Sequence, residues 1–385
     1  MAGGARRAAS PRPGDNIVKH SLSEQLAGIY HSHADHFSGA ILIADRSGVL
    51  FTAANGYANR DFRIPNTVDT RFDTASVTKV FTAVAALQLI EKGALAFGGR
   101  IADIVDLRGT RIPADVTVEH LLTHTSGIAD DADEEAGEDY AALFIDRPNY
   151  AIRECKDFLP QFAYKEPIFQ AGTDVRYNNC AFVLLGLAIE QISGIPYRDY
   201  VTENIFRRCG MERSCFQSKD EICPDTAEGY FAVTDERGKF VKWRKNIYSY
   251  PPIGTPDGGA YTTVTDLYRF WMAVQGSALL TPDYTAMLMA PQCGFSRPNK
   301  YGRRRFGYAF EYIEAKKEIF CVYKDGVNNG VEAMLSYYPR QGVCLNMLSN
   351  QAGAFWKLND EMRSAIGRAP CTTPTTRPSS PHRAG

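Results

Sequence analysis

The order of the predicted secondary structure constrains the fold of this chain more than any other feature. Residues 39–45 and 48–54 are apolar, strand-like runs that flank an Arg46-Ser47 turn and predict a β-hairpin. Three more strands are predicted near the other end, over 318–323, 332–338 and 342–349. Strands so far apart in sequence favour one sheet that is built from both ends of the chain, with a largely helical region inserted between them.

Helical periodicity replaces the strand pattern in between. From Ser76 to Lys92 apolar residues recur at spacings of three and four, and Gly93 stands where a left-handed C-cap belongs. Residues 183–192 are apolar nearly all round, which is typical of a central buried helix. Helices are also expected at 23–31 and at about 354–366.

These patterns predict an α+β fold, with an antiparallel sheet flanked by helices and an inserted, largely helical domain. We expect the sheet domain to comprise residues 16–92 and 240–366, and the mainly helical domain residues 93–239. Residues 1–15 and 367–385 are rich in Ala, Arg, Pro, Thr and Ser and are expected to be disordered. The cleft between the two domains is the expected ligand site.

The charge balance, the absence of long apolar runs and the placement of the cysteines limit the classes of function that the chain can have. Lys and Arg total 43 against 44 Asp and Glu, so the chain lacks the broad field that would hold nucleic acid or an anionic membrane. No run approaches the ~18 consecutive apolar residues of a membrane helix. Arg6-Arg7 is not followed by an apolar run, and the nine cysteines are scattered, which favours reduced thiols. We therefore expect a cytoplasmic protein whose partner is a small molecule.

Ser76-Val77-Thr78-Lys79 is the sharpest short motif. Ser76 and Lys79 lie on one helix face, so the amine can reach the hydroxyl. A serine alcohol is a poor nucleophile until a base takes its proton. A lysine can act as that base once burial or a second positive charge lowers its pKa. By itself the S-x-x-K spacing is common by chance, usually with an exposed lysine.

Two further segments offer complementary chemistry. Tyr177-Asn178-Asn179 precedes the buried helix, where a phenol can relay a proton and an amide can hold a carbonyl group. Lys324-Asp325-Gly326 ends a predicted strand, where a second cation can help to lower the pKa of Lys79 and the glycine can let substrate approach the backbone. Taken alone, Tyr177 is as well explained by packing, and Lys324 by a solvated strand edge.

In this order, the three motifs resemble those of the serine β-lactamase and penicillin-binding protein superfamily, in particular its class C β-lactamase, D,D-peptidase and esterase branch. The resemblance extends over about residues 20–366 through segments 72–79, 121–127, 171–173, 184–186, 205–206, 210–211, 258–259 and 265–267. It implies a β-lactamase/transpeptidase-like fold and a serine acyl-enzyme, with no metal and no organic cofactor.

The resemblance also implies a role for each matched residue. Ser76 would be the acylated nucleophile, Lys79 its general base and Tyr177 the group that shuttles a proton to the leaving group. Asn179 would hold the substrate amide or Lys79, and the N–H groups of Ser76 and Val327 would form the oxyanion hole.

The third motif departs from the family pattern. Asp325 stands where members that act on penicillins or D-Ala-terminated peptides have a hydroxyl residue that helps to bind the substrate carboxylate. Two like charges a few ångströms apart repel by roughly 1 to 4 kcal/mol. We therefore expect a neutral small-molecule ester or amide as substrate, or an amine-bearing acyl acceptor that Asp325 attracts. The predicted function is a serine acyl-enzyme hydrolase.

Alternative functions use the same residues. A cytosolic transacylase would pass the acyl group to an amine or alcohol, and a D,D-peptidase or penicillin-binding protein would act on peptides. A non-catalytic β-lactam-binding module would keep only the scaffold.

We predict no catalytic role for three other polar segments. The string from His31 to His36 matches the H-x-H-x-D-H metal motif of the metallo-β-lactamase superfamily, but it precedes the first strand and is expected to be a polar helix end. Asp130 to Asp139 is expected to be a solvated loop that borders the cleft, and Arg303 to Arg305 a surface cluster.

Overall fold

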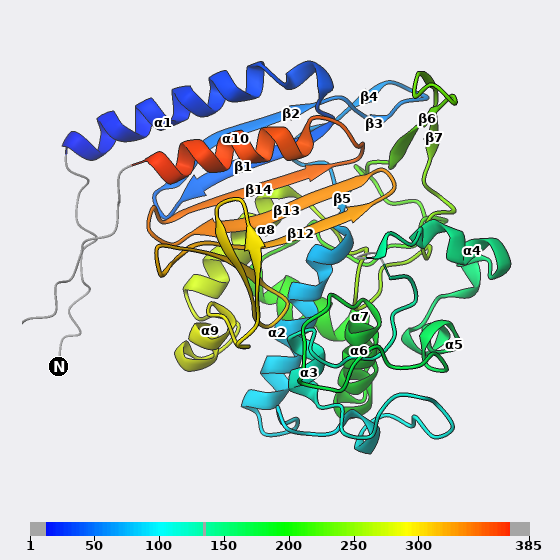
Figure 1. Ribbon diagram of the computed structural model, residues 1–385. Coiled ribbons are helices and arrows are strands. Elements are labelled where there is room, and N and C mark those ends of the chain that lie inside the picture. Colours follow the sequence, from blue (N-terminus) through cyan, green and yellow to red (C-terminus); the bar gives the residue numbers. More distant parts are fainter. Residues whose placement is uncertain (1–12, 134–135, 370–385) are drawn as a thin grey trace, which may run out of the picture.

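The two ends of the chain meet in one antiparallel sheet. The computed structural model describes residues 13–133 and 136–369. Its main sheet has eight strands in the order β2-β1-β14-β13-β12-β11-β10-β9 (Figure 1). These strands are β1 Gly39–Asp45, β2 Gly48–Asn55, β9 Ser296–Asn299, β10 Gly302–Phe306, β11 Glu311–Ala315, β12 Glu318–Asn328, β13 Val331–Tyr338 and β14 Val343–Ser349. Because β1 pairs with β14, the predicted joining of distant strands is confirmed.

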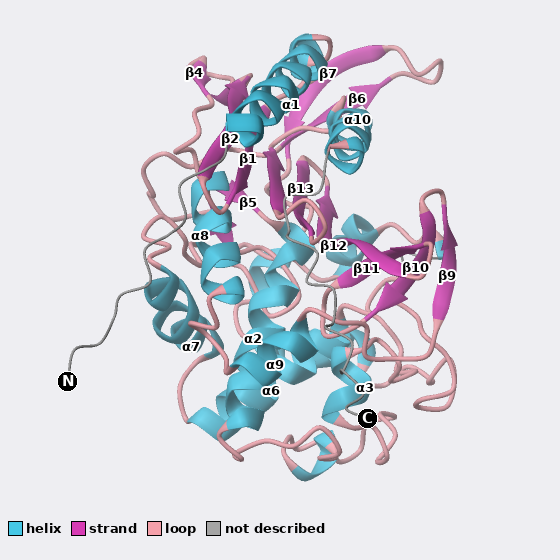
Figure 2. Ribbon diagram, turned by 90° about the vertical axis from the view of Figure 1, so that its left-hand side faces the viewer, coloured by secondary structure: helices cyan, strands magenta, loops and turns pink. Residues whose placement is uncertain are grey.

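The sheet is covered on both faces. Side chains alternate along β1, so Ile41 and Ile43 face one side while Leu42 faces the other. On the first side lie α1 Pro13–His31 and α10 Phe355–Arg368, as Figure 1 shows. The opposite side packs against α8 Val264–Gln275 and the rest of the helical region (Figure 2). All seven residues of β1 are buried as a result.

Two apolar helices form the centre of the helical region. They are α2 Thr78–Glu91 and α6 Cys180–Ser193, and the predicted buried helix at 183–192 lies within α6. Gly93, with φ +72°, adopts the left-handed conformation that its position after α2 predicts. Around these helices are α3 Val118–Leu122, α4 Leu143–Asp146, α5 Leu159–Phe162, α7 Tyr197–Val201 and α9 Pro282–Leu288.

Short strands and single helical turns complete the described chain. The two-stranded ribbons are β3 Tyr57–Asn59 with β4 Ile64–Pro65, β5 Phe72–Asp73 with β8 Tyr261–Thr262, and β6 Tyr230–Thr234 with β7 Phe240–Lys245. The helical turns are Ala34–His36, Ala75–Val77, Ile101–Asp103, Tyr140–Ala142, Asn149–Ala151, Cys155–Phe158, Thr202–Phe206 and Arg207–Cys209.

Several predicted boundaries were wrong. The first helix begins at Pro13 instead of residue 23, and α10 continues to Arg368, so residues 13–15 and 367–368 are helical and not disordered. Residues 1–12 and 370–385 lie outside the described residues. The predicted strand at 318–323 continues to Asn328, because all seven residues 322–328 pair with β13. The third motif therefore lies inside a strand.

No single helix within residues 13–133 and 136–369 has the length and apolar composition to cross a membrane. One pair, Cys180–Ser193 with Tyr197–Cys209, meets those two criteria jointly but is bent by 81°. The division of the chain into two domains stays a prediction.

Candidate active site

Ser76 lies in a helical turn, Ala75–Val77, that leads directly into α2. Ala75 has a φ of +41°, a conformation that is strained for a residue with a Cβ atom. The Asp73 carboxylate accepts a 2.7 Å hydrogen bond from the Ala75 N–H and thereby holds this turn. Ser76 is thus presented at the start of a buried helix, as its position in the sequence predicts.

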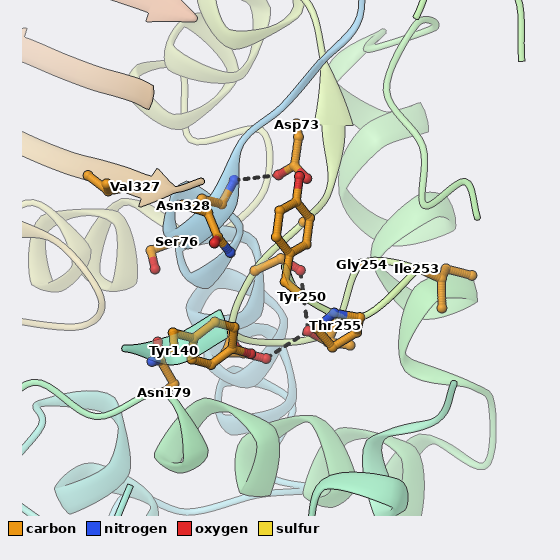
Figure 3. Close-up of a pocket in the computed structure, with 15 residues that line it drawn as sticks. Asp73, Ser76, Tyr140, Asn179, Tyr250, Ile253, Gly254, Thr255, Val327 and Asn328 are labelled. Atoms are coloured by element: carbon orange, nitrogen blue, oxygen red, sulfur yellow. Dashed lines mark hydrogen bonds between the residues drawn. The ribbon is translucent and has the colours of Figure 1, made fainter. Parts of the chain in front are cut away.

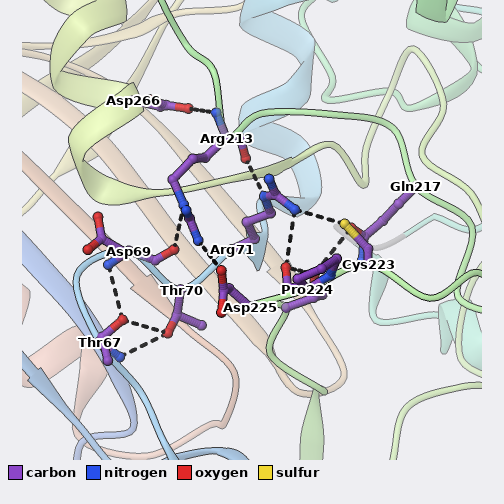
Figure 4. A network of polar contacts seen from close by, with 11 residues as sticks. Thr67, Asp69, Thr70, Arg71, Arg213, Gln217, Cys223, Pro224, Asp225 and Asp266 are labelled. Carbon is purple, nitrogen blue, oxygen red and sulfur yellow. Dashed lines mark hydrogen bonds and ion pairs between the residues drawn. The ribbon is translucent and has the colours of Figure 1, made fainter.

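An arginine network fixes the strand that leads to this turn (Figure 4). Arg71 immediately precedes β5, and its Nε donates to the Arg213 carbonyl oxygen at 3.0 Å. The backbone N–H of Arg213 in turn donates to Asp266 Oδ2 on α8 at 2.9 Å. The segment upstream of Ser76 is therefore anchored to elements more than 130 residues away in sequence.

Lys79 places its amine beside the Ser76 hydroxyl. The side chain is fully buried, and Nζ donates to Ser76 Oγ at 3.1 Å. It also donates to Asn179 Oδ1 at 2.7 Å and to the Asp257 carbonyl oxygen at 2.6 Å. The two carbonyl oxygens fix two amine protons, so the third direction faces Ser76, where a neutral amine can accept the serine proton.

Tyr177 contacts the same serine. Its hydroxyl donates a 2.6 Å hydrogen bond to Ser76 Oγ. The centre of its ring lies 4.9 Å from Lys79 Nζ and 4.7 Å from Lys324 Nζ. Both lysine side chains therefore lie against the ring whose hydroxyl contacts Ser76.

Lys324 belongs to a buried row of charges that the sequence did not reveal. Its Nζ lies 3.3 Å from Glu311 Oε1 and 3.4 Å from Asp325 Oδ1, and the Arg304 Nε donates to the other Glu311 oxygen. Burial raises the pKa of Glu311, but the charges of Lys324 and Arg304 outweigh it and bring that pKa to about 2. Glu311 is therefore ionised and balances two cations.

Arg304 corrects the interpretation of residues 303–305 as a surface cluster. The three arginines lie on β10, where alternate side chains point to opposite faces. Arg303 is exposed and Arg305 pairs with Glu314, whereas Arg304 faces the serine. Strand alternation around Arg304 was the available signal, but no strand had been predicted there.

Ser76 lies where two cavities meet. The charged cavity, of about 250 Å³, is lined by Ser76, Tyr177, Arg304, Glu311, Lys324, Asp325 and Val327. The tyrosine cavity, of about 40 Å³, is lined among others by Ser76, Asp73, Tyr140, Asn179, Tyr250 and Val327 (Figure 3). Ser76 and Val327 border both cavities, so a bound molecule can extend to either side of Ser76.

Gly326 allows β12 to lie against the nucleophile turn. A Cβ atom at this position would lie 2.3 Å from the Thr74 carbonyl oxygen and 2.9 Å from the Ser76 nitrogen. Contacts that short do not occur, so any larger residue would push the strand away. The glycine thus serves the approach of one backbone to another. Val327 follows it, and its part in the oxyanion hole stays a prediction.

Asp130 orients Asn179 at the start of α6. Its carboxylate accepts hydrogen bonds from the N–H groups of Asn179 at 2.9 Å and Cys180 at 3.0 Å. Asp130 is partly buried and its neighbour Asp131 is buried, so the expectation of a solvated loop from Asp130 onwards was wrong for these two residues. Burial and the nearby Asp130 charge raise the pKa of Asp131 well above its usual value.

Within the part of the chain that the structure describes, the histidine string at 31–36 is not part of a group of three metal-ligand side chains. His33 Nε2 lies 3.1 Å from Glu361 Oε1, which places this helix end beside α10. Among residues 13–133 and 136–369, the one group of three ligand-bearing side chains within 4.8 Å is Asp130, Asp131 and Cys180.

Comparisons with known proteins agree with this geometry. The family model described as Beta-lactamase matches residues 24–365. Among solved structures, a penicillin-binding protein from Bacillus halodurans is 36% identical, with a TM-score of 0.80 over 89% of this chain and 98% of that chain. Two curated relatives are penicillin-binding protein 4 of Amycolatopsis lactamdurans, 24% identical over 86% of each chain, and esterase EstB of Burkholderia gladioli, 33% identical over 72% of this chain and 75% of that one.

The extent of the match differs among relatives. The chain spans 52%, 55% and 62% of the length of three further curated relatives. The family model nevertheless covers nearly all the described chain, and it includes the serine, tyrosine and second-lysine motifs. The chain therefore belongs to the Beta-lactamase family, and its sheet and helices form the β-lactamase/transpeptidase fold that its motifs predict.

Proposed function

We propose that the protein is a serine acyl-enzyme hydrolase that cleaves an ester or amide of a small molecule. One observation carries the proposal: Ser76 Oγ is hydrogen-bonded to the buried Lys79 amine at 3.1 Å and to the Tyr177 hydroxyl at 2.6 Å. A serine with a base and a proton shuttle at an open cavity is equipped for covalent catalysis.

Acylation involves Ser76, Lys79 and Tyr177. Ser76 Oγ bonds to the substrate carbonyl carbon while its proton passes to neutral Lys79. The N–H groups of Ser76 and Val327 stabilise the oxyanion. The tetrahedral intermediate then collapses, and the bond from the acyl carbon to the leaving oxygen or nitrogen breaks. The leaving atom takes a proton from Tyr177, and Lys79 passes its proton to Tyr177 in return.

Deacylation repeats these steps with water. Water adds to the acyl carbon and gives its proton to Lys79 through Tyr177. The bond from the acyl carbon to Ser76 Oγ then breaks, the serine oxygen regains the proton, and the free acid departs.

Asp325 supports a substrate without a carboxylate at this end of the site. Its side chain lines the charged cavity and is 36% exposed, whereas Lys324 is 2% exposed and paired with Glu311. The accessible charge nearest the third motif is therefore negative, which favours a neutral ester or amide or one that carries an ammonium group.

Acyl transfer to an amine is the second candidate. The tyrosine cavity supports it, because it offers a place beside Ser76 for an acceptor that is separate from the charged cavity. We also propose a cytosolic location, which is supported by the free thiol state of the eight described cysteines.

The test is covalent labelling of the purified protein with a fluorophosphonate, followed by peptide mass spectrometry. We expect one adduct at Ser76, none in Ser76→Ala, and unchanged labelling in Ser32→Ala, an exposed serine far from the site. Hydrolysis of a panel of p-nitrophenyl esters and anilides should fall by about 10³-fold or more in Ser76→Ala. Labelling of Ser76→Ala at the wild-type rate would contradict the proposal.

Products in the presence of amines separate the two candidate functions. Reactions with each ester are run with and without primary amines, and the products are identified by mass spectrometry. Amide products that form faster with the wild type than with Ser76→Ala support transfer. Free acid as the sole product excludes it for those amines.

A further inference from the structure

His124 accepts hydrogen bonds from the residues on both sides of Tyr177. Its backbone carbonyl oxygen accepts a 3.0 Å hydrogen bond from the Arg176 N–H. Its side-chain Nδ1 accepts a 3.1 Å hydrogen bond from the Asn178 N–H. A single residue thus fixes the peptide group between Val175 and Arg176 and the one between Tyr177 and Asn178, and the orientation of the Tyr177 side chain depends on both.

The imidazole ring also packs directly on the phenol. Its centre lies 4.8 Å from that of the Tyr177 ring and 5.1 Å from that of Phe182 on α6. The tyrosine ring is therefore in contact with His124 as well as with the Nζ atoms of Lys79 and Lys324. These contacts leave the phenol little freedom to turn away from Ser76.

His124 retains two features that are unfavourable for folding. Its backbone φ of +59° is uncommon for a residue other than glycine. Its Nε2 is buried and has no hydrogen-bond partner among the described residues. Because Nδ1 accepts a hydrogen bond, Nε2 must carry the proton of the neutral ring, so a buried donor is left unpaired. Strain and an unpaired polar group at one residue are typical of a functional constraint.

The ring is neutral at this position. Burial lowers the pKa of His124 well below its usual value, and Lys324 and Lys79 lower it further. Glu311 acts in the opposite direction and Arg304 in the same direction as the lysines. A neutral ring can keep its Nδ1 lone pair for the Asn178 N–H, whereas a protonated ring could not.

We propose that His124 is a positioning residue that holds the Tyr177 hydroxyl on Ser76 Oγ by fixing the backbone N–H groups of Arg176 and Asn178, the residues on either side of Tyr177. This inference rests on the proposed function for its kinetic consequences. Its geometric consequence, the position of Tyr177, does not depend on activity.

Two substitutions distinguish the contribution of the aromatic ring of His124 from that of its Nδ1 hydrogen-bond acceptor. His124→Phe keeps an aromatic ring against Tyr177 but loses the Nδ1 acceptor. His124→Asn keeps a side-chain acceptor and tolerates positive φ, so it provides a second variant if the phenylalanine form does not fold. We expect labelling of Ser76 by the fluorophosphonate to slow by about 100-fold in His124→Phe, and by about 10-fold in His124→Asn, with KM for an ester changed less than kcat.

A double-mutant cycle with Tyr177→Phe tests whether His124 acts through the phenol. In the Tyr177→Phe background, either His124 substitution should slow labelling by less than about 2-fold. Leu358→Ala, in α10 beyond the sheet, serves as a control for lost stability and should label at the wild-type rate. The proposal would be overturned if the single His124 variants label Ser76 at the wild-type rate. It would also be overturned if the fold-reduction in labelling rate of the double variant equals the product of the two single-variant reductions.

Crystal structures of His124→Asn and His124→Phe distinguish failure of this inference from failure of the proposed function. We expect the Tyr177 hydroxyl to lie beyond about 3.5 Å from Ser76 Oγ in at least one conformer. A hydroxyl that stays at the wild-type distance in both His124 variants would overturn the positioning role, whatever the activity. Absence of any adduct in the wild type would instead refute the proposed function.

Discussion

Lys324 and Glu311 form a buried ion pair between neighbouring strands, with Nζ 3.3 Å from Oε1. Their side chains are only 2% and 4% exposed. The second cation of the site therefore has a fixed partner in the protein before any substrate binds. This relationship explains how a lysine can lie beneath the reactive tyrosine without an external anion.

Glu311→Gln should change how stability depends on pH. The ion pairs lower the pKa of Glu311 from 4.5 to about 2, so its carboxylate stabilises the folded state above pH 4.5, and this stabilisation is lost as the pH falls towards 2. Removing one partner of a buried pair should lower the free energy of unfolding by about 3 kcal/mol at pH 7. Urea denaturation from pH 7 to 3 should show this difference shrinking below pH 4.5. A constant difference would contradict the ionised state of Glu311.

Tyr177→Phe should slow acylation with little effect on stability. The aromatic ring keeps its contacts with Lys79 and Lys324, whereas the hydroxyl that donates to Ser76 Oγ at 2.6 Å is lost. Loss of a positioned proton shuttle should reduce kcat by about 10² to 10⁴-fold. Steady-state kinetics with a chromogenic ester measure this loss. Tyr164→Phe, at an exposed position, is the matched control and should keep wild-type kinetics.

Asp325→Thr should improve reactions with anionic substrates. The substitution removes the accessible negative charge of the charged cavity and supplies a hydroxyl group. Relief of like-charge repulsion should raise the rate of Ser76 acylation by benzylpenicillin by about 10-fold or more. Acylation by a neutral ester should change little. Equal effects on both reagents would show that Asp325 does not discriminate charge.

Gly326→Ala should misplace the nucleophile. Its Cβ would lie 2.3 Å from the Thr74 carbonyl oxygen and 2.9 Å from the Ser76 nitrogen, so β12 and the turn must separate. Displacement of about an ångström at the reacting centre can reduce the rate by about 100-fold. Gly28→Ala is the matched control, because nothing lies within 4 Å of the added carbon. Labelling rates of Ser76 in the two variants provide the comparison.

Glu332→Gln should stabilise the protein at alkaline pH. Burial raises the pKa of Glu332 from 4.5 to about 7, and its Oε2 has no partner among the described residues. The wild type therefore loses stability as the pH rises from 4.5 through 7, since the buried carboxylate must then ionise. We expect the variant to gain about 2 kcal/mol over the wild type between pH 5 and 9. Melting temperatures of both proteins across this range would test it, and a constant difference would contradict it.

The sequence by itself determined what depends on local spacing. A three-residue interval on a helix is sufficient to place Lys79 beside Ser76, and apolar strand-like runs with their turn residues are sufficient to locate the β1–β2 hairpin and the core of β13 and β14. Such patterns are reliable because backbone hydrogen bonding repeats over a few residues, so the sequence of one segment contains the whole signal.

Only the tertiary structure decided which distant groups complete the site. Glu311, Arg304, Asp257 and His124 reach the Ser76 region through strand pairing and helix packing that join segments far apart in sequence. Their local sequences do not show these contacts, because burial and neighbouring charge come from other parts of the chain. The same reason explains Gly326, whose need for a hydrogen in place of Cβ arises only when β12 meets the turn before α2.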